Sequence, residues 1–558
     1  YHMVCDESYL ISKLYGNIEE MNAARAFAAS FGSKLGALGI LWYEPLGDSN
    51  AYKSYPLDYV LKSIQLVSAK ATWGEPNSAY FSAIGGAIEL SSSHWDKGSF
   101  IFDDDGVRWF SDMGAEAYEL ADGSSHYGAA GAYIFRKRAE GHNCLLINPS
   151  AEDPGQVTGA YAALSRFETK PRGIIAEYDL AEVYGDKVTS YKRGFLFGDN
   201  RNSLVVQDEV ELSKPNSEIY HYLYTTGKVE VSPDKKTAYI TEDGKTLKIE
   251  YICDASSWHV EAQAANSLFP ELHKAGEHSR ASYTRVALVG KASGKLNISI
   301  KCTVEDELET YEPHRLVPMS QWTLPDGEIP PKPEIDAIYV NGEPLADFEP
   351  LKNDYSISLT ADTPIPVFTA TSTTGTVEVI APETLNDYAR LIVSNEHGKR
   401  AYRIKFNFII RETENLMDTK PVDGIPADVK KLKVAYCYAD HNPQTDNSDK
   451  NAVDDNLETR WSSDVKPSFI EVDVGEVTNI SGVALAYMDS QRFYKYDILV
   501  SKDKINYEKI YTGTSSGLKN EWDYLPLGVD ARYVRYVGYG HADGEWNSIL
   551  EFRPCGKQ

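Results

Sequence analysis

The hydrophobic pattern of the chain changes near Trp73, and this change constrains the fold more than any other feature of the sequence. Residues 19–38 are rich in Ala and Leu, and residues 57–70 carry apolar side chains at three-to-four spacing, so both segments are predicted to be helical. Beyond Trp73, short β-branched or aromatic segments such as 99–102 and 194–197 are separated by Gly, Asp and Asn turns. We therefore expect a mainly β chain in which a short helical segment precedes a large antiparallel β-sandwich.

A proline-rich stretch at 323–333 separates this sandwich from the C-terminal part of the chain. Its four prolines remove backbone donors and fix φ, so neither a helix nor a central strand is expected to cross it. Alternation at 354–359 then predicts a small immunoglobulin-like β-sandwich, followed by a third β unit. The expected division is a helical end at 1–75, a β-sandwich at 76–315, a Pro-rich linker at 316–334, the small sandwich at 335–411, a linker at 412–431 and the last β unit at 432–558.

The composition indicates an extracellular protein that acts on sugars. The chain holds 82 acidic and 56 basic residues, a formal net charge of −26, so its long-range field repels nucleic acids and anionic membranes. It has no run of about 18 apolar residues, so no membrane insertion is expected. An aromatic share of 11% suits stacking on sugar rings. We expect a secreted or cell-surface protein, processed or truncated ahead of Tyr1.

Six cysteines are present, and none belongs to a CxxC pattern, which argues against zinc-finger and thioredoxin sites. Two disulfides are compatible with the sequence. Cys437 and Cys555 bracket the last unit, and Cys253 and Cys302 lie on neighbouring strand-like segments. The sequence leaves both pairings open.

Three residues have the chemistry of a metal site. His94 precedes a predicted strand, Asp112 follows 18 positions later, and His142 lies a further 30 positions on. Two imidazoles and one carboxylate are a normal ligand set for Zn²⁺ and leave a fourth position for water. Taken singly, a histidine at a strand edge or an aspartate near a glycine is more often structural. Only the set of three indicates a site.

The sequences around these residues together resemble the central sandwich of heparinase II/III-like polysaccharide lyases. The stretches that carry the resemblance are 94–100, 112–114 and 142–147, and the likeness extends over about residues 1–310. It implies that the helical segment is the end of an α/α toroid. It also implies that the three residues hold a zinc ion whose role is mainly structural.

The resemblance further implies β-elimination from an acidic, uronic acid-containing polysaccharide. Such a reaction needs a neutralised carboxylate, a base for the C5 proton and an acid for the leaving oxygen. In the family, the toroid supplies an Asn or His and a Tyr, and the sandwich adds a histidine two positions before the first metal ligand. In this chain that position is Ser92, and Tyr1 is the one residue that aligns with the tyrosine. These two residues are the catalytic candidates.

Basic and aromatic residues between Asp112 and His142 are candidates for substrate binding. If residues 136–138 form a strand, Arg136 and Arg138 point to one face and can meet an anionic sugar. Tyr118 can stack on the same sugar. Alternatively, the arginines lie at a solvated strand edge and the tyrosine is buried.

Residues from about 432 onward resemble the discoidin, or factor V/VIII type C, modules, which often bind carbohydrate. The stretches that carry this resemblance are 451–461 and 548–552. It implies a calcium site, since carboxylate, amide and hydroxyl oxygens are the ligands that Ca²⁺ prefers. The calcium ligands carried over are Asp454, Asn456, Thr459 and Glu551. Asp455 stands where the family usually has Gly, and an acidic loop of this kind can also be a solvated turn.

Glycan contacts in discoidin-like modules come from loops at one end. The candidates here are Tyr436, His441, Tyr487, Arg492, Tyr494 and Trp546. Aromatic residues at such a rim can instead close the barrel. The unit at 335–411 resembles the cadherin-like spacers of bacterial surface enzymes.

Two functions are compatible with these resemblances. The first is a secreted lyase of an acidic polysaccharide, with an N-terminal toroid fragment as an expected partner and this chain inactive by itself. The second is a non-catalytic glycan-binding or adhesion protein with a degenerate sandwich, which Ser92 favours. A zinc hydrolase is not supported, because the chain has no HExxH-like arrangement. The identity of the polysaccharide stays open.

Overall fold

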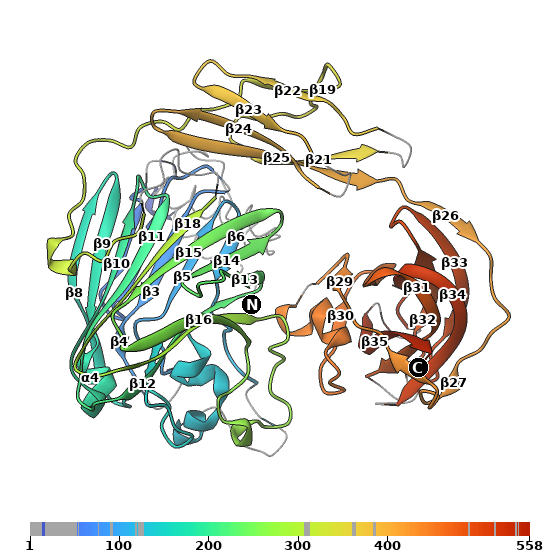
Figure 1. Cartoon of the computed structure of the whole chain (residues 1–558), viewed down its shortest axis with the longest axis horizontal. Coiled ribbons are helices and arrows are strands. Elements are labelled where there is room, and N and C mark those ends of the chain that lie inside the picture. The colour runs from blue at the N-terminus through green and yellow to red at the C-terminus, as the bar shows by residue number, and fades with distance from the viewer. Residues whose placement is uncertain are drawn as a thin grey trace.

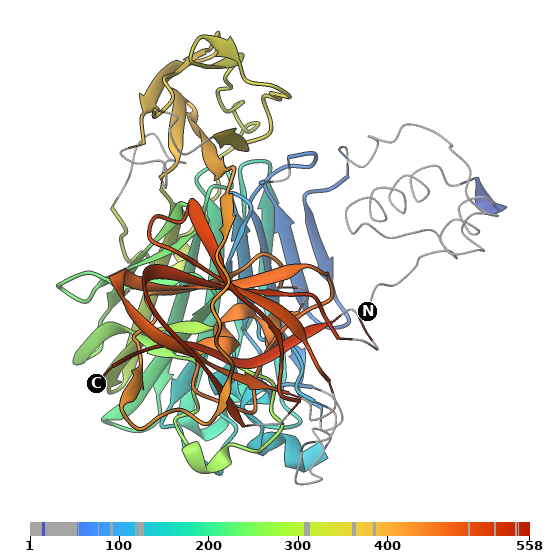
Figure 2. The same ribbon diagram turned by 90° about the vertical axis from the view of Figure 1, so that its right-hand side faces the viewer.

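The computed structural model has three β-rich units, which Figures 1 and 2 show from two sides. The large sandwich and the C-terminal unit lie beside each other, and the middle unit lies across the top of both (Figure 1). The chain is thus mainly β, as predicted. The structure describes residues 14–16, 53, 55–75, 77–89, 93–117, 120, 128–305, 313–359, 364–382, 387–442, 444–488, 492–517, 521–541, 544 and 546–557.

Three sheets make up the large sandwich. Nine strands form one sheet in the order β13 (Lys228–Val231), β14 (Thr237–Glu242), β15 (Lys245–Cys253), β18 (Lys295–Val304), β11 (Ser203–Leu212), β10 (Val188–Gly198), β9 (Gly173–Asp179), β8 (Tyr161–Lys170) and β4 (Gly86–Ala87). Five form the order β1 (Asp58–Leu61), β2 (Leu66–Lys70), β3 (Tyr80–Ile84), β5 (Phe100–Asp104) and β6 (Val107–Phe110). Four form the order β16 (Ser257–Ala264), β17 (Thr284–Ala292), β12 (Ser217–Thr225) and β7 (Leu145–Ile147).

Aromatic side chains fill the space between these sheets. Phe81 on β3 and Phe100 on β5 lie against Phe195 on β10, with ring centroids 5.0 and 5.4 Å from it. All three rings are buried. Alternation along each strand directs these residues inward, which is the period-two pattern that predicted the sandwich. Short helices connect the strands: η2 (Gly128–Tyr133), η3 (Phe135–Lys137), η4 (Ala139–Gly141), α4 (Ala181–Tyr184), η5 (Gly185–Lys187) and η6 (Pro270–Leu272).

The prediction of a helix over residues 57–70 is wrong, because this segment forms β1 and β2. The two strands pair antiparallel, and Val67 and Ala69 point into the core while their neighbours are half-buried. A turn with Gln65 at a φ of 50° precedes β2. Two short strands joined by a turn can also carry apolar residues at three-to-four spacing. The spacing in residues 57–70 therefore fits a helix and a pair of strands equally well. The sandwich therefore begins before residue 76, and residues 19–38 lie outside the described part of the chain.

The predicted linker at 316–334 begins as a packed segment. Met319 of helix η7 (Met319–Gln321) and Trp322 are buried against Ile175 on the outer face of the nine-stranded sheet. Gly194 makes this approach possible, because a Cβ there would lie 2.2 Å from the Met319 sulfur. Arg166 fixes the segment by donating to the carbonyl oxygens of Met319 and Trp322 at 2.9 Å.

The middle unit has two small sheets and its own core. One sheet has the order β20 (Glu343–Pro344), β19 (Ala337–Val340) and β22 (Phe368–Thr371), and the other has β21 (Asp354–Leu359), β25 (Gly398–Phe408), β24 (Ala389–Asn395) and β23 (Thr376–Ile380). Strands β21 and β25 pair in parallel. Arg403 joins this unit to the large sandwich through Asp105, at 2.6 Å. Its likeness to immunoglobulin or cadherin modules stays a prediction.

The C-terminal unit is a second large β structure. Its main path is β26 (Arg411–Glu414), β33 (Asn506–Thr514), β32 (Lys495–Ser501), β34 (Trp522–Gly538), β31 (Ser468–Tyr487), β35 (Asn547–Lys557) and β28 (Val429–Lys431). Three strands pair off this path, β27 (Val422–Asp423) with β34, β29 (Tyr436–Ala439) with β31 and β30 (Trp461–Ser463) with β35. The predicted linker at 412–431 therefore supplies β26, β27 and β28 to this unit instead of separating it.

The four cysteines considered for disulfides are all free thiols in the structure. Cys437 pairs with Val472 and Cys555 with Gly482, ten residues apart along β31. Cys302 pairs with Ile249, which lies four residues from Cys253 on β15. Neither pair can reach the Cα separation of about 4.4–6.8 Å that a disulfide requires.

Candidate functional site

A cleft of about 620 Å³ opens on the large sandwich. Its walls come from β3 and β4, from the segment before β5, and from the loop after β6. His94 and Asp112 both line it, together with Asp96 and Lys97. The cleft therefore lies where two of the three stretches that resembled a lyase meet.

The structure brings His94, Asp112 and His142 together. The Nδ1 atom of His142 lies 2.7 Å from Oδ2 of Asp112, and the other carboxylate oxygen accepts the Gly114 amide at 2.7 Å. The rings of His94 and His142 have centroids 5.2 Å apart. Residues separated by 48 positions thus form one cluster at the wall of the cleft, at the place that the sequence predicted.

The charges in this cluster balance one another. Burial lowers the pKa of His94 to about 4, with His142 adding to the effect, so His94 offers a neutral imidazole at neutral pH. Burial acts to raise the pKa of Asp112, but the adjacent His142 holds it at about 2. Burial likewise opposes the charge on His142, yet Asp112 raises its pKa overall.

The three side chains have donor atoms that zinc accepts, but these atoms do not converge on one position that a metal ion could occupy. The Nε2 atom of His142 is buried without a hydrogen-bond partner, which suits a metal ligand. However, His142 uses Nδ1 for Asp112, and within the described residues no three His, Cys, Asp or Glu side chains form a metal-binding group. Zinc at this cluster stays a prediction.

A buried guanidinium supports the backbone around the cluster. Arg193 on β10 donates from Nη1 to the carbonyl oxygens of Gly98 and Asn143, both at 2.9 Å. Its other donors bind Asp208 at 2.7 and 2.8 Å. The segments that follow His94 and His142 are therefore held by one side chain. Arg193 was not among the predicted site residues, because nothing in the local sequence pattern distinguishes a buried arginine.

The catalytic candidates Ser92 and Tyr1 and the substrate-binding candidate Tyr118 lie outside the described residues. Within the cleft, Asp96 and Lys97 were not predicted from the sequence. These two form an ion pair of 2.7 Å, and Lys97 is buried. They lie in the charged stretch between His94 and strand β5, directly beside the predicted metal ligand, and this position could have indicated them.

The prediction that Arg136 and Arg138 lie on a strand and face substrate is wrong. They belong to or directly follow the 3-10 helix η3, and both side chains are almost fully buried. Arg138 donates to four backbone carbonyl oxygens, among them Ser150 and Asp153 at 2.7 Å. Arg136 likewise donates to the carbonyl oxygens of Met113 and Ser279. Most of their guanidinium donors are used within the protein, so neither offers a free charge to a sugar.

The predicted calcium ligands come together in the C-terminal unit, between η9 (Asp449–Val453) and β30. The Asp454 carboxylate accepts the Thr459 hydroxyl at 2.8 Å and the Asn456 amide at 3.0 Å. Glu551 on β35 accepts the same amide at 2.9 Å. Burial and the nearby Asp454 raise the pKa of Glu551 to about 8, because two buried carboxylates cannot both ionise without a cation.

Asp455, which stands where the family usually has Gly, adopts a backbone conformation that favours glycine. Its φ of 62° lies in the left-handed region that favours glycine. Its carboxylate accepts from Arg553 at 2.6 Å and from Lys431 at 2.7 Å, and these ion pairs anchor the strained residue.

The glycan candidates of this unit divide into exposed and buried residues. Tyr487 and Tyr494 are fully buried and stack with centroids 5.8 Å apart, so their prediction as surface contacts is wrong: they close the barrel. Tyr436 is 58% exposed and Trp546 is 37% exposed. His441 pairs with Asp464 at 2.7 Å.

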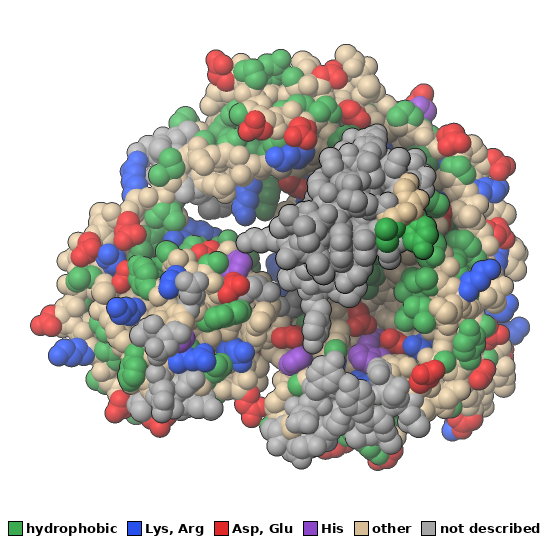
Figure 3. Space-filling model, turned by 180° about the vertical axis from the view of Figure 1, so that it is seen from behind, with side chains coloured by type: hydrophobic (Ala, Val, Ile, Leu, Met, Phe, Trp, Pro, Cys, Tyr) green, Lys and Arg blue, Asp and Glu red, His purple; other side chains and the backbone are tan. Residues whose placement is uncertain are grey.

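Arg492 has a charged neighbour that was not predicted from the sequence. Burial is the main cause of the lowered pKa of Arg460, and the charge of Arg492 adds to it. Phe493, adjacent to Arg492, is 54% exposed. Basic side chains beside an exposed ring suit an anionic sugar. On the face drawn in Figure 3, acidic and basic side chains are interspersed.

Two family models match the chain. Residues 77–301 match the heparinase II/III-like C-terminal domain, and residues 437–552 match the F5/8 type C domain. Both domains predicted from the sequence are thereby confirmed. A search among curated proteins finds no match. No described helix has the length and apolar character needed to span a membrane.

Several solved structures are similar to the chain. A heparinase III is 12% identical over 72% of this chain and 47% of that one, with a TM-score of 0.38. Heparan sulfate lyase HepC from Pedobacter heparinus is 13% identical over 60% and 48%, with a TM-score of 0.37. The family 32 carbohydrate-binding module of AlyQ, in complex with 4,5-unsaturated mannuronic acid, is 28% identical over 22% and 97%, with a TM-score of 0.21. The chain spans about half the length of the two heparan-degrading enzymes.

Proposed function

We propose that the chain is the β-rich part of a secreted polysaccharide lyase that cleaves an acidic, uronic acid-containing polymer by β-elimination. One observation carries the proposal: in the region that matches the heparinase II/III-like domain, His94 and Asp112 line a cleft, and the buried His142 lies 2.7 Å from Asp112. The cleft volume of about 620 Å³ lies in the range of ligand-binding pockets. An N-terminal toroid, in the same or a separate chain, would complete it.

The reaction divides the work between the sandwich and the toroid. Elimination requires a neutralised substrate carboxylate, a base and an acid. The described part of the cleft supplies charged and polar groups from His94 to Lys97 that can orient the sugar. The proton transfers fall to residues outside the described part, for which Tyr1 and Ser92 stay the candidates.

We also propose that His94, Asp112 and His142 hold zinc. The donors fit the ion, and zinc bound there would cross-link three segments of the cleft wall and thereby set its shape. Elemental analysis tests this assignment. Zinc near one equivalent in the wild type and its loss in His142→Ala would support the proposal, and metal-free wild-type protein would oppose it.

The C-terminal domain would anchor the enzyme on its polymer. Its loop from Asp454 to Thr459, with Glu551, is proposed to bind calcium, and Arg460, Arg492, Phe493 and Trp546 are proposed to contact the acidic glycan. An adhesin that binds glycans without cleaving them is the second candidate function. It is favoured by the same surface of the C-terminal domain, which needs no cleft.

The ultraviolet absorbance of the unsaturated uronate product distinguishes the two functions. The chain, alone and together with a heparinase-type toroid, should be incubated with heparan sulfate, alginate and pectate. A rise in absorbance that is lost in His142→Ala supports the lyase. Binding to the same polymers without any rise supports the adhesin.

A further inference from the structure

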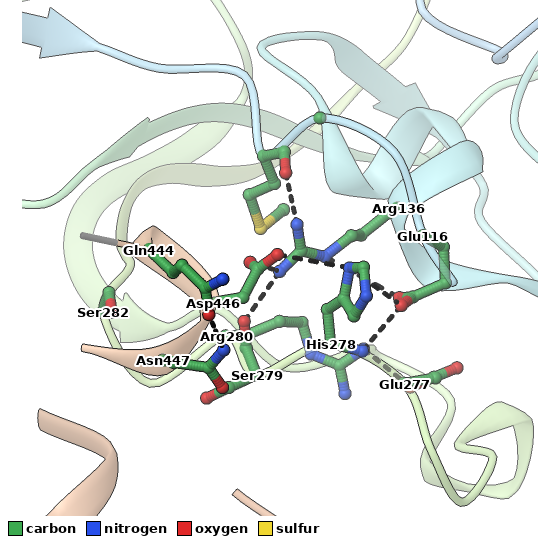
Figure 4. Close-up of polar contacts among 12 residues, drawn as sticks. Glu116, Arg136, Glu277, His278, Ser279, Arg280, Ser282, Gln444, Asp446 and Asn447 are labelled. Carbon is green, nitrogen blue, oxygen red and sulfur yellow. Dashed lines mark hydrogen bonds and ion pairs between the residues drawn. The ribbon is translucent and has the colours of Figure 1, made fainter. Parts of the chain in front are cut away.

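A buried polar contact joins the large sandwich to the C-terminal domain. Figure 4 shows its residues, which come from the loop after β6, from η3, from the segment before β17 and from the loop that contains η8 (Thr445–Asn447). Arg136 lies at its centre and is about 1% exposed. A guanidinium so deeply buried needs partners on every side, and those partners belong to both domains.

Arg136 connects the cleft loop to the C-terminal domain. Its Nη1 donates to the carbonyl oxygen of Met113, the residue next to Asp112. Its Nη2 donates to the Ser279 carbonyl oxygen and to Oδ1 of Asp446, both at 2.7 Å. The loop that lines the cleft and a loop of the C-terminal domain therefore share one side chain (Figure 4).

Two carboxylates meet at this contact, and the Arg136 guanidinium and the His278 imidazole of the sandwich face both. Glu116 has a buried side chain 3.7 Å from Nε of Arg136. The Nδ1 atom of His278 lies 3.2 Å from Asp446 and 3.5 Å from Glu116. The His278 amide also donates to Glu116 at 2.6 Å. Asp446 of the C-terminal domain thus contacts Arg136 and His278, which both belong to the sandwich.

Further hydrogen bonds extend the contact. Ser279 donates to Oδ1 of Asn451 at 2.7 Å, and Asn451 in turn donates to the Arg460 carbonyl oxygen at 2.8 Å. Lys450 donates to the Thr226 carbonyl oxygen at 2.8 Å. Asn451 is fully buried. The backbone of Arg460, at the proposed glycan surface, is therefore tied to the sandwich through one amide side chain.

We propose that these residues form a fixed joint, which holds the C-terminal domain against the loop that lines the cleft instead of leaving it a freely tethered binding module. The joint holds the Met113 loop on one side and the segment from Asp446 to Arg460 on the other. Only the description of the cleft as a substrate site rests on the proposed function. The joint itself is a statement about how two domains of this chain bind each other.

Hydrogen exchange and small-angle X-ray scattering of the whole chain test the joint. The variant Asp446→Lys, Lys450→Glu places like charges against Arg136 and an anion against the Thr226 carbonyl oxygen. We expect the amides of Gly114 and His278 to exchange roughly tenfold faster or more, because charged hydrogen bonds are lost. The radius of gyration should increase, since the domain then moves on its connection to the middle unit.

A matched variant and a conservative variant control this experiment. Asp530→Lys, Lys502→Glu makes the same charge changes at exposed positions of the same domain and should leave both measurements unchanged. Asp446→Asn keeps an oxygen acceptor for Arg136 and should retain most of the protection. Protection of β34 amides in all variants shows that the domain is folded.

Wild-type exchange and scattering in the joint-breaking variant would overturn the proposal, as would faster exchange in the matched control. The measurements need no substrate. An absent lyase activity would therefore contradict the proposed function without contradicting the joint. Unchanged exchange in the joint-breaking variant would contradict the joint without contradicting the proposed function.

Discussion

The large sandwich and the C-terminal domain differ in how the charges at their candidate sites are paired. In the sandwich, buried charges face opposite charges: Arg193 binds Asp208 through two hydrogen bonds, and His142 pairs with Asp112. In the C-terminal domain, like charges come together at two places. Burial and the neighbouring Asp454, in the loop before β30, raise the pKa of Glu551 on β35, and burial together with the charge of Arg492 lowers the pKa of Arg460.

Where buried charges have opposite partners, those charges belong to the scaffold. A balanced pair stabilises the fold only while both partners are present, so removing one is costly. A pair of like charges is unfavourable until a counterion arrives, so removing one member costs the fold little and costs binding much. The sandwich should therefore lose stability on mutation, and the C-terminal domain should lose affinity.

The largest expected effect comes from removing Arg193. Arg193→Ala leaves Asp208 buried without its partner and frees the carbonyl oxygens of Gly98 and Asn143. We expect a loss of about 3–5 kcal/mol in the free energy of unfolding of the sandwich. Differential scanning calorimetry resolves its transition from those of the other domains.

Arg108→Ala is the matched control, because Arg108 pairs with Asp103 at the surface with half of its side chain exposed. It should cost about 1 kcal/mol or less. Equal losses in the two variants would contradict the idea that the buried pair is structural.

Acid should weaken the sandwich through His221. Burial lowers the pKa of this histidine to about 3 from an ordinary value of 6.5, and Arg193 contributes to the shift. Between these values the unfolded state binds more protons, so stability falls as the pH falls. One such group contributes up to about 1.4 kcal/mol per pH unit, or about 2.8 kcal/mol over two units.

His221→Leu tests this assignment, since neither ring nitrogen of His221 has a hydrogen-bond partner to lose. The sandwich transition of this variant should depend less steeply on pH between about 6 and 4. A pH dependence identical to that of the wild type would assign the acid sensitivity to other groups.

Local sequence motifs predicted the domains and the cluster of His94, Asp112 and His142. These motifs lie at strand edges and turns, where neighbouring residues in the sequence determine the local structure. They failed where tertiary contacts decide. Residues 57–70 have a period that fits a helix as well as two short strands, and only pairing with β3 selects the strands. A run of basic residues at 136–138 suggests a charged surface, yet these side chains are buried, and the two arginines donate to backbone carbonyl oxygens.

The same limit applies to the C-terminal domain. Tyr487 and Tyr436 are both tyrosines near predicted loops, but one is buried and the other exposed. Their difference depends on which face of β31 or β29 each occupies, and a single-residue register change reverses it. The contact between Arg136 and Asp446 joins positions 310 apart, for which no local pattern exists.

Calcium should stabilise the C-terminal domain and leave the sandwich unaffected. A cation between Asp454 and Glu551 offsets the repulsion of the carboxylates. At a calcium concentration one hundred times the dissociation constant, the gain is about 2.7 kcal/mol. Calorimetry with calcium and then with excess chelator measures it. Asp454→Asn should abolish the calcium response, and a shift of the sandwich transition alone would contradict the site.

The smallest expected effect on stability, and the sharpest test of the comparison, concerns the arginine pair. Arg492→Ala removes a like charge from beside Arg460, so the melting temperature should stay the same or rise slightly. Affinity for an acidic oligosaccharide should fall roughly tenfold, which corresponds to about 1.4 kcal/mol. Isothermal titration calorimetry on the whole chain measures both wild type and variant. If Arg492→Ala lowers stability without changing affinity, the pair belongs to the scaffold and the contrast between the two domains fails at this point.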